Sequence, residues 1–196
     1  MSLSKRKIAA TFLTGKTIYL RGLKEEDLSG GYVSWLNDTE VCQYNSHHVF
    51  PYSVENVRSY IRESSQAKNA LVLAIILKQS NRHIGNISLQ NINYINRSAE
   101  FAVLLGDKKY WGKGIAKEAS RLIVEHGFKE LNLNRIYCGT SADNIVMQRL
   151  ARFLGMSKEG VRRQALYKHG RFVNIIEYGL LKAGFSEHFG NKDKLR

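Results

Sequence analysis

Tyr110-Trp111-Gly112-Lys113-Gly114-Ile115-Ala116 is the stretch that decides the fold, because its two glycines separate an apolar segment from a helical one. The preceding residues 100–105 predict a buried strand, and residues from Ile115 to His126 recur at helical spacing. Glycine permits positive φ, and the first turn of a helix presents free N–H groups and the positive end of its dipole. The stretch therefore predicts a strand, a glycine turn and a helix, with the turn suited to a phosphate group.

A glycine pair in this position is also ordinary turn chemistry, so the turn alone does not establish a phosphate site. Two nucleotide-binding motifs are excluded. The spacing lacks the third glycine of a dinucleotide fingerprint, and no Lys-Ser or Lys-Thr closes the turn as in a P-loop. The choice between a plain turn and a phosphate site depends on the rest of the chain.

Three stretches give the chain a wider resemblance. Residues 111–116 match an acetyl-CoA signature of Gln or Arg, two residues, Gly, one residue and then Gly or Ala, with tryptophan in the first position. Residues 144–156 match a helix that opens with Asn and closes with Leu-Gly-Phe, and residues 159–162 and 178–181 match a final hairpin. From Thr17 to Leu181 the chain resembles the GNAT-superfamily N-acetyltransferases, closest to the branch of ribosomal-protein N-terminal (Rim-type) acetyltransferases.

The resemblance implies an α/β (α+β) fold: a mixed, mostly antiparallel central sheet with helices on both faces and two strands splayed at a cofactor slot. It also implies an acyltransferase that moves acetyl directly from acetyl-CoA to a primary amine, with no metal. The pantetheine arm would pair with a bulged strand formed by Val103, Leu104 and Leu105. This strand would splay away from the strand at residues 136–140. The pyrophosphate would bind the N–H groups of Trp111, Gly112, Lys113, Gly114, Ile115 and Ala116.

Glu100 matches a carboxylate that this branch often places near the acceptor, so the resemblance makes it the candidate general base. A structural pairing with Arg97 or with a neighbouring strand is the alternative. Many relatives carry a tyrosine acid where this chain has Ala151, and Met147 departs from the family in the same helix. Since a thiol pKa is about 8.5, thiolate is a tolerable leaving group without that acid. Three sources of its proton stay open: Ser141, Tyr137 or solvent.

Several polar residues have both a functional and a plain interpretation. Asn144 is either a helix N-cap or a contact to the cofactor. The loop between the first two predicted helices offers candidate acceptor residues: His47, His48 and Tyr52. A basic stripe on the helix after the glycine turn could assist phosphate binding or be solvated: Lys113, Lys117 and Arg121.

Charge is distributed unevenly along the chain. The net charge is +13, yet residues 25–63 hold seven acids and two bases, a local net charge of −5. These acids could steer a cationic amine into an acceptor cleft beside a basic cofactor lobe, or they could form a solvated helix face.

Composition favours one domain in a reducing compartment. We expect the domain over 15–185, with loose basic tails at 1–14 and 186–196. The longest apolar run, Ala70 to Leu77, has eight residues and is too short to cross a bilayer. Cys42 and Cys138 are isolated, which favours the cytoplasm over a disulfide framework or a zinc site.

Periodicity predicts the remaining elements. The predicted strands are 17–23, 70–77, 83–91, 98–105 and 135–140, the helices are 27–36, 54–65, 114–131 and 144–154, and a hairpin spans 158–181. Ser53 is the predicted N-cap of the second helix, and residues 79–81 are a predicted hairpin turn.

The acceptor class stays open among a peptide or protein N-terminus, an amino sugar and a polyamine. The alternative of a different class is a noncatalytic basic binding module on the same scaffold, associated with RNA or the ribosome. The missing tyrosine favours this alternative, whereas the acidic segment and the lack of an RNA-binding signature oppose it. We therefore expect a small-molecule or peptide amine as partner, with no nucleic acid and no membrane. Exposed strands of the terminal hairpin could pair with a second copy of the chain.

Overall fold

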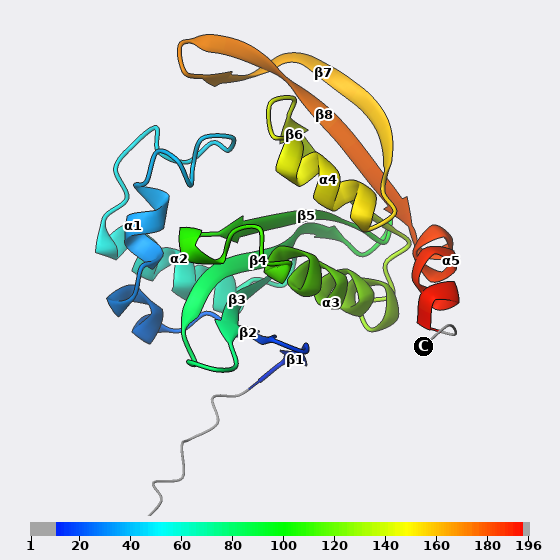
Figure 1. Cartoon of the computed structure of the whole chain (residues 1–196), viewed down its shortest axis with the longest axis horizontal. Helices are drawn as coiled ribbons and strands as arrows, with labels where there is room; N and C mark the ends of the chain where they lie inside the picture. Colours follow the sequence, from blue (N-terminus) through cyan, green and yellow to red (C-terminus); the bar gives the residue numbers. More distant parts are fainter. Residues whose placement is uncertain (1–10, 194–196) are drawn as a thin grey trace, which may run out of the picture.

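The computed structural model describes residues 11–193, which form one eight-stranded sheet flanked by helices (Figure 1). The strand order is β1-β2-β3-β4-β5-β6-β8-β7, and β5 and β6 are the parallel pair in an otherwise antiparallel sheet. The strands are β1 (Leu13–Thr14), β2 (Ile18–Gly22), β3 (Leu71–Leu77), β4 (His83–Asn93), β5 (Ser98–Leu105), β6 (Arg135–Ser141), β7 (Ser157–Lys168) and β8 (Arg171–Leu181). The predicted fold class is confirmed.

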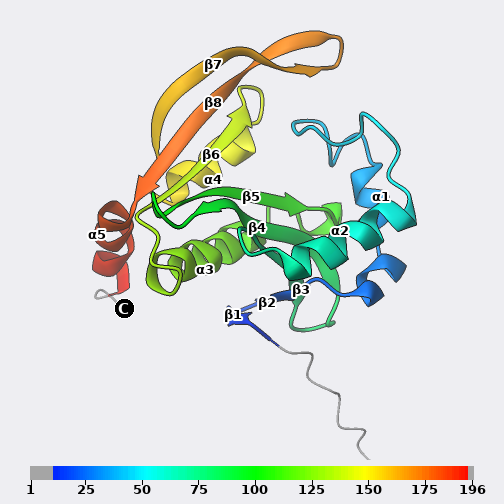
Figure 2. The ribbon, with the colours of Figure 1, turned by 180° about the vertical axis from the view of Figure 1, so that it is seen from behind.

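Helices cover both faces of the sheet (Figures 1 and 2). They are η1 (Glu25–Ser29), α1 (Tyr32–Leu36), α2 (Val54–Gln66), η2 (Lys108–Tyr110), α3 (Ile115–Lys129), α4 (Ile145–Phe153) and α5 (Lys182–Asp193), where η marks a 3-10 helix. One hydrophobic core lies under α3 and α4, and a second lies under α1 and α2. No helix in the described part of the chain is long and apolar enough to span a membrane.

The alternation of side chains along each strand creates these two cores. Along β3, Leu73 and Ile75 enter the core under α3, whereas Ala74 and Ile76 enter the core under α1 and α2. All four side chains are at most 3% exposed, so this strand is apolar on both faces. Burial on both faces explains why residues 70–77, from which this strand was predicted, form a continuous apolar run.

The predicted helix over 27–36 is wrong, because the chain forms two short helices instead. Gly30 has extended backbone (φ −89°, ψ −153°) and separates η1 from α1. Two successive glycines lower helix propensity at this point. A Cβ on Gly31 would lie 2.6 Å from the indole nitrogen of Trp35, so close packing also requires glycine here.

The predicted C-terminal tail over 186–196 is also wrong where the structure describes it, because α5 continues to Asp193. Phe185 and Phe189 are 7% and 5% exposed, and the Phe185 ring lies 5.3 Å from that of Phe128 on α3. These aromatic contacts stabilise a helix with little amphipathic patterning. Of the predicted N-terminal tail, residues 1–10 lie outside the described range, and Leu13 and Thr14 pair with β2.

Candidate active site

The strands β5 and β6 separate after a short paired region. Their pairing covers Ser98↔Arg135, Ala99↔Ile136 and Glu100↔Tyr137, after which β5 continues to Leu105 without β6 beside it. Over its own remaining length β6 stays paired with β8. The edge of β5 beyond Glu100 therefore offers backbone N–H and C=O groups to a ligand in place of a strand. The predicted splay is confirmed.

The end of β5 differs from the prediction in one respect. Val103, Leu104 and Leu105 pair with β4 in regular register, and the register shift lies further back, between Gln90 and Asn93. The expected bulge at residues 103–105 is thus absent. The Trp111 indole N–H donates to the carbonyl of Leu105 at 2.7 Å, so that carbonyl already has a partner. Val103 and Leu105 lie against the core under α3, and Leu104 lies against the other core.

The glycine turn has the geometry that the sequence predicts. Gly112 and Gly114 have φ of 73° and 79°, in the left-handed region that favours glycine. A Cβ at either position would meet nothing within 4 Å, so the glycines serve conformation and the space in front of them is open. Trp111 and Lys113 are exposed, whereas Ile115 is buried and Ala116 is half-buried at the start of α3. The turn thus presents the N-terminus of a fifteen-residue helix to solvent.

Each cation of the predicted basic stripe lies over an aromatic ring. The distances from cation to ring centroid are 5.3 Å for Lys113 over Tyr110, 5.0 Å for Lys117 over Phe153 and 4.7 Å for Arg121 over Phe189. Cation–π contact orients these side chains without neutralising their charge. Neither lysine forms an ion pair within residues 11–193, so both stay available to an anion.

Asn144 is the N-cap of α4, as one of its two predicted roles required. Its side-chain oxygen accepts a hydrogen bond from the Met147 N–H at 3.0 Å. Ala151 is completely buried, so the position where relatives carry a tyrosine acid is part of the core. Ser141 is 3% exposed, and its hydroxyl oxygen accepts from the Asp143 N–H at 3.2 Å.

Glu100 occupies the vertex of the splay, as the last residue of β5 paired with β6. Alternation places its side chain on the same face as Leu104, which is the face of α1 and α2. Its carboxylate accepts from Asn91 Nδ2 at 2.9 Å, while Arg97 donates instead to Asn132. The alternative pairing with Arg97 is therefore not present, whereas the alternative pairing with a neighbouring strand is, through Asn91 on β4.

Tyr137 is the partner of Glu100 across the vertex. Burial, followed by the charge of Glu100, raises the pKa of its phenol. The hydroxyl is therefore protonated at neutral pH and next to the candidate base. A raised pKa makes Tyr137 a weaker proton donor toward a departing thiolate than an unperturbed tyrosine would be.

The structure brings together two of the three predicted acceptor residues. His47 Nδ1 lies 2.7 Å from the Tyr52 hydroxyl, and the two rings pack edge to face. Burial and then the charge of Lys168 lower the pKa of His47, which is neutral at pH 7. His48 is exposed and has left-handed backbone (φ 61°). A surface cavity of about 300 Å³ adjoins this pair, lined by Ser46, Val49, Phe50, Pro51, Tyr52 and Asn56.

Ion pairs compensate part of the charge of the acidic segment. Arg58 pairs with Glu25 and Glu55 inside the segment. Lys108, from outside the segment, lies 2.8 Å from an oxygen of Asp38 and 2.7 Å from one of Glu40. Arg58 is already counted in the local charge of −5, so Lys108 is the addition, and it lowers by one unit the negative charge that a ligand would meet. Sequence reasoning missed this compensation because Lys108 is 68 residues from Glu40.

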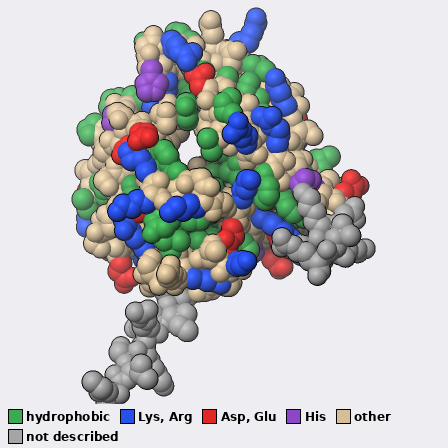
Figure 3. Space-filling model, viewed as in Figure 1, with side chains coloured by type: hydrophobic (Ala, Val, Ile, Leu, Met, Phe, Trp, Pro, Cys, Tyr) green, Lys and Arg blue, Asp and Glu red, His purple; other side chains and the backbone are tan. Residues whose placement is uncertain are grey.

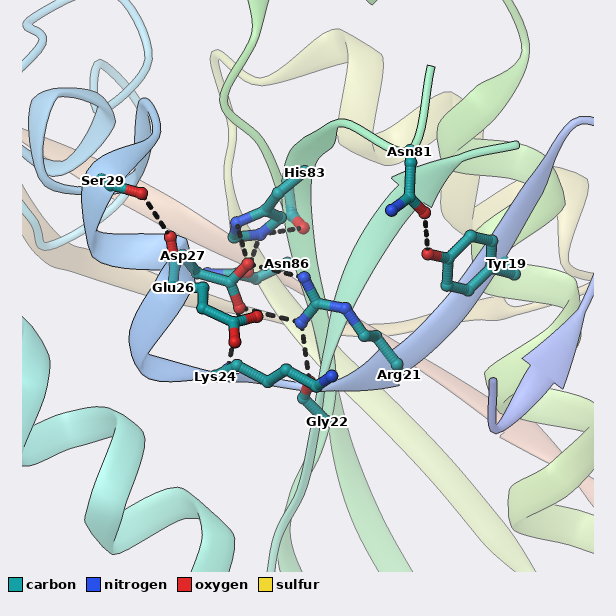
Figure 4. Close-up of polar contacts among 11 residues, drawn as sticks. Tyr19, Arg21, Gly22, Lys24, Glu26, Asp27, Ser29, Asn81, His83 and Asn86 are labelled. Carbon is teal, nitrogen blue, oxygen red and sulfur yellow. Dashed lines mark hydrogen bonds and ion pairs between the residues drawn. The ribbon is translucent and has the colours of Figure 1, made fainter. Parts of the chain in front are cut away.

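A buried polar cluster anchors η1 to the sheet, and the sequence gives no local signal for it (Figure 4). Arg21 on β2 donates to both oxygens of Asp27 on η1, at 2.9 and 2.7 Å. His83 Nε2 faces two acceptors, the Gly85 carbonyl and Asn86 Oδ1, so this nitrogen carries the proton. Burial lowers the pKa of His83, and its Nδ1 lies 3.4 Å from Asp27.

The chain matches the family profile described as an acetyltransferase (GNAT) domain over residues 17–157. Spermidine N(1)-acetyltransferase of Escherichia coli (strain K12) is 29% identical over 164 residues, covering 82% of this chain and 83% of the relative. Spermidine N-acetyltransferase of Vibrio cholerae, solved with CoA and spermine, has a TM-score of 0.79 at 24% identity and covers 86% of this chain and 98% of its own. RimL, a ribosomal L7/L12 alpha-N-protein acetyltransferase solved with CoA, has a TM-score of 0.77 at 22% identity, with coverage of 85% and 94%.

Proposed function

We propose that this chain, which belongs to the GNAT acetyltransferase family, binds acetyl-CoA between β5 and β6 and transfers its acetyl group to a primary amine at the Glu100 vertex. The observation that carries the proposal is the continuity of two features. The unpaired edge of β5 leads through η2 directly into the open glycine turn at the start of α3. One extended ligand with a peptide-like arm and a phosphate end fits both.

Acetyl-CoA supplies a thioester whose carbonyl is open to attack by an amine. The backbone groups of residues 101–105 hold the arm and can donate a hydrogen bond to the carbonyl oxygen as charge develops there. The N–H groups of Trp111 to Ala116 bind phosphate, with Lys113 and Lys117 beside them. Asn144 keeps its side-chain amide nitrogen for the ligand, since its oxygen caps α4.

Glu100 removes a proton from the acceptor amine, directly or through water. For an alkylamine of pKa about 10.4 at pH 7.5, reaching the neutral form costs about 4 kcal/mol, whereas an α-amine near 7.8 costs well under 1 kcal/mol. A carboxylate at the vertex is therefore most useful for an alkylamine. His47 and Tyr52 lie on the acceptor side and would contact the body of the acceptor.

Two further proposals concern context. Cys42 and Cys138 are both free and buried, which fits a reducing cytoplasm. β7 is a twelve-residue edge strand with mostly exposed side chains, and an unpaired edge is a template for pairing with a second copy. Sedimentation equilibrium would test the dimer, and a monomer across the micromolar range would exclude it.

Binding and turnover test the main proposal. CoA at about 100 times its Kd should stabilise the protein by about 2.7 kcal/mol and raise Tm accordingly. Thiol release from acetyl-CoA should then depend on an added amine, measured over a panel of diamines, peptides and amino sugars. No thermal shift at millimolar CoA would reject the cofactor site. A thermal shift without turnover on any amine would favour a noncatalytic binding module.

A further inference from the structure

The two halves of the sheet that part at the Glu100 vertex are joined again at their far ends. From the vertex, one half follows β5 to Leu105 and η2, and the other follows β6 and β8 to the tip of the β7–β8 hairpin. In Figures 1 and 2 this tip lies over the loop between α1 and α2. Figure 3 shows the surface hollowed between the hairpin and the rest of the molecule.

The first junction ties the loop to the β5 half. Lys108, two residues before Tyr110 and the glycine turn, is bound to Asp38 and Glu40 of the loop at 2.8 and 2.7 Å. The Asn37 side chain also closes the base of the loop, because it exchanges two hydrogen bonds of 2.8 Å with the backbone of Tyr52. Lys108 thus holds the loop to the β5 half of the sheet.

The second junction ties the loop to the hairpin. Lys168 Nζ, at the hairpin tip, donates to the carbonyl oxygen of His47 at 2.8 Å, across 121 residues of sequence. Lys168 has no ion pair within the described residues, and its charge acts on both His47 and the buried Cys42. It is therefore a half-buried cation whose hydrogen bond spans the open end of the splay.

We infer that these contacts close a ring around the proposed transfer site and that Lys168 is a specificity-determining residue, restricting the acceptor to a primary amine on a narrow, unbranched chain. The inference rests on the proposed function. The ring runs from the vertex along β6 and β8 to Lys168, through His47 and the loop to Lys108, and back along β5. An acceptor that approaches from the α1 face must thread this opening, and a peptide with side chains must first break the Lys168 bond.

The Lys168 bond is the weaker of the two junctions. Lys108 contacts two carboxylates, whereas Lys168 contacts one carbonyl. A hydrogen bond from a charged donor contributes enough to change a rate constant by about tenfold when it must be broken first. The bond therefore disfavours wide acceptors relative to narrow ones, and Lys168 does so without contacting the reacting atoms.

The test compares acceptors of different width in three variants. Lys168→Met removes both the hydrogen bond and the positive charge, whereas Lys168→Arg keeps a charged donor. Arg163→Met is the control, because it removes an exposed positive charge elsewhere on β7. The acceptors are 1,4-diaminobutane and a ten-residue peptide with a free N-terminus, with a nucleotide-linked amino sugar as a third, wide acceptor. Thiol release gives kcat/KM for each.

Relative to Arg163→Met, Lys168→Met should raise kcat/KM about tenfold for the peptide and the amino sugar and less than twofold for 1,4-diaminobutane. Lys168→Arg should resemble the parent protein. Equal changes for narrow and wide acceptors, or a parent protein that prefers the peptide, would overturn the inference. Failure of the proposed function has a different signature, since no amine would then be acetylated by any variant or CoA would give no thermal shift.

Discussion

The two faces of the sheet are built from different kinds of interaction. On the α3 face, the proposed cofactor site is formed by backbone: an unpaired strand edge, two glycines with positive φ and a helix N-terminus. The α1 face depends on side chains that pair across distant elements, such as Lys108 with Asp38 and Arg21 with Asp27. The difference teaches that the proposed cofactor site depends on local backbone geometry, whereas the proposed acceptor side depends on single long-range pairs.

The largest expected effect is on the α3 face. Gly114→Asp places a side chain and a negative charge at a left-handed position where phosphate should bind, so the CoA-dependent rise in Tm should disappear. Backbone strain from such a substitution is about 1–2 kcal/mol and leaves the fold intact.

Gly170→Asp is the matched control for that strain. Gly170 has φ of 76° and open space around its Cβ position, but it lies in the turn of the β7–β8 hairpin. Gly170→Asp should lower Tm by an amount similar to that of Gly114→Asp and leave the CoA-dependent rise in Tm unchanged. Equal CoA affinity in the Gly114 variant and the parent protein would show that the glycine turn is only a turn.

The contrast between the faces also explains what the sequence could predict. The glycine turn, the Ser53 and Asn144 caps and the alternating strands are signals within about four residues, and the structure confirms them. The splay was available only through family resemblance. Nothing local connects Lys108 to Glu40 or Lys168 to His47, so the acceptor side could not be predicted from spacing.

Two predictions about helices were wrong, each for a local reason. The helix predicted over 27–36 is interrupted by two glycines, and the tail predicted beyond 186 is instead a helix because Phe185 and Phe189, four residues apart, share one buried face. The phenylalanine spacing was present in the sequence as a signal. Its weakness is that the rest of α5 is polar, so only packing on Phe128 shows its purpose.

The second-largest effect is expected for a substitution of Glu100, on the α1 face. Glu100→Gln removes the base and should lower kcat by about 10²–10⁴ with little change in KM for acetyl-CoA. The defect should shrink as pH rises, since solvent then deprotonates the amine. The measurement is a pH profile of kcat for each protein.

Glu177→Gln is the control for Glu100. Glu177 is a carboxylate on β8 that Arg162 already binds, so its neutralisation should change kcat far less. A purely structural Glu100 would give the opposite pattern: a lower Tm for Glu100→Gln with full turnover per folded molecule.

The buried pair under η1 tests stability on the same face. Arg21 and Asp27 side chains are 9% and 3% exposed, so Asp27→Asn leaves Arg21 buried without its charge partner and should cost about 3 kcal/mol of unfolding free energy. The exposed neighbour Glu26 is the control, and Glu26→Gln should stay within about 0.5 kcal/mol. Denaturant unfolding measures both.

The pH dependence of that difference has a defined sign. Burial alone would raise the pKa of Asp27, but the Arg21 hydrogen bond and the charge of His83 bring it below 3.8. The stabilisation is therefore complete above pH 3.8 and is lost as pH falls through the folded-state pKa. The parent protein and Asp27→Asn should converge in Tm at acid pH, and a constant gap would point to packing instead.

The smallest effect concerns the compensated acids of the loop. The Lys108 hydrogen bond lowers the pKa of Asp38, and the same ammonium lies 2.7 Å from an oxygen of Glu40, so one cation offsets part of the charge of this pair of carboxylates. Lys108→Met exposes these carboxylates beside the cleft and should raise kcat/KM for 1,4-diaminobutane about twofold at low salt. The gain should vanish near 1 M salt, where the Debye length is about 3 Å. Lys109→Met removes a neighbouring charge that has no ion pair within residues 11–193, and it should show no such gain. A loss of activity in Lys108→Met at every salt concentration would mean that Lys108 serves to position the loop rather than to mask its charge.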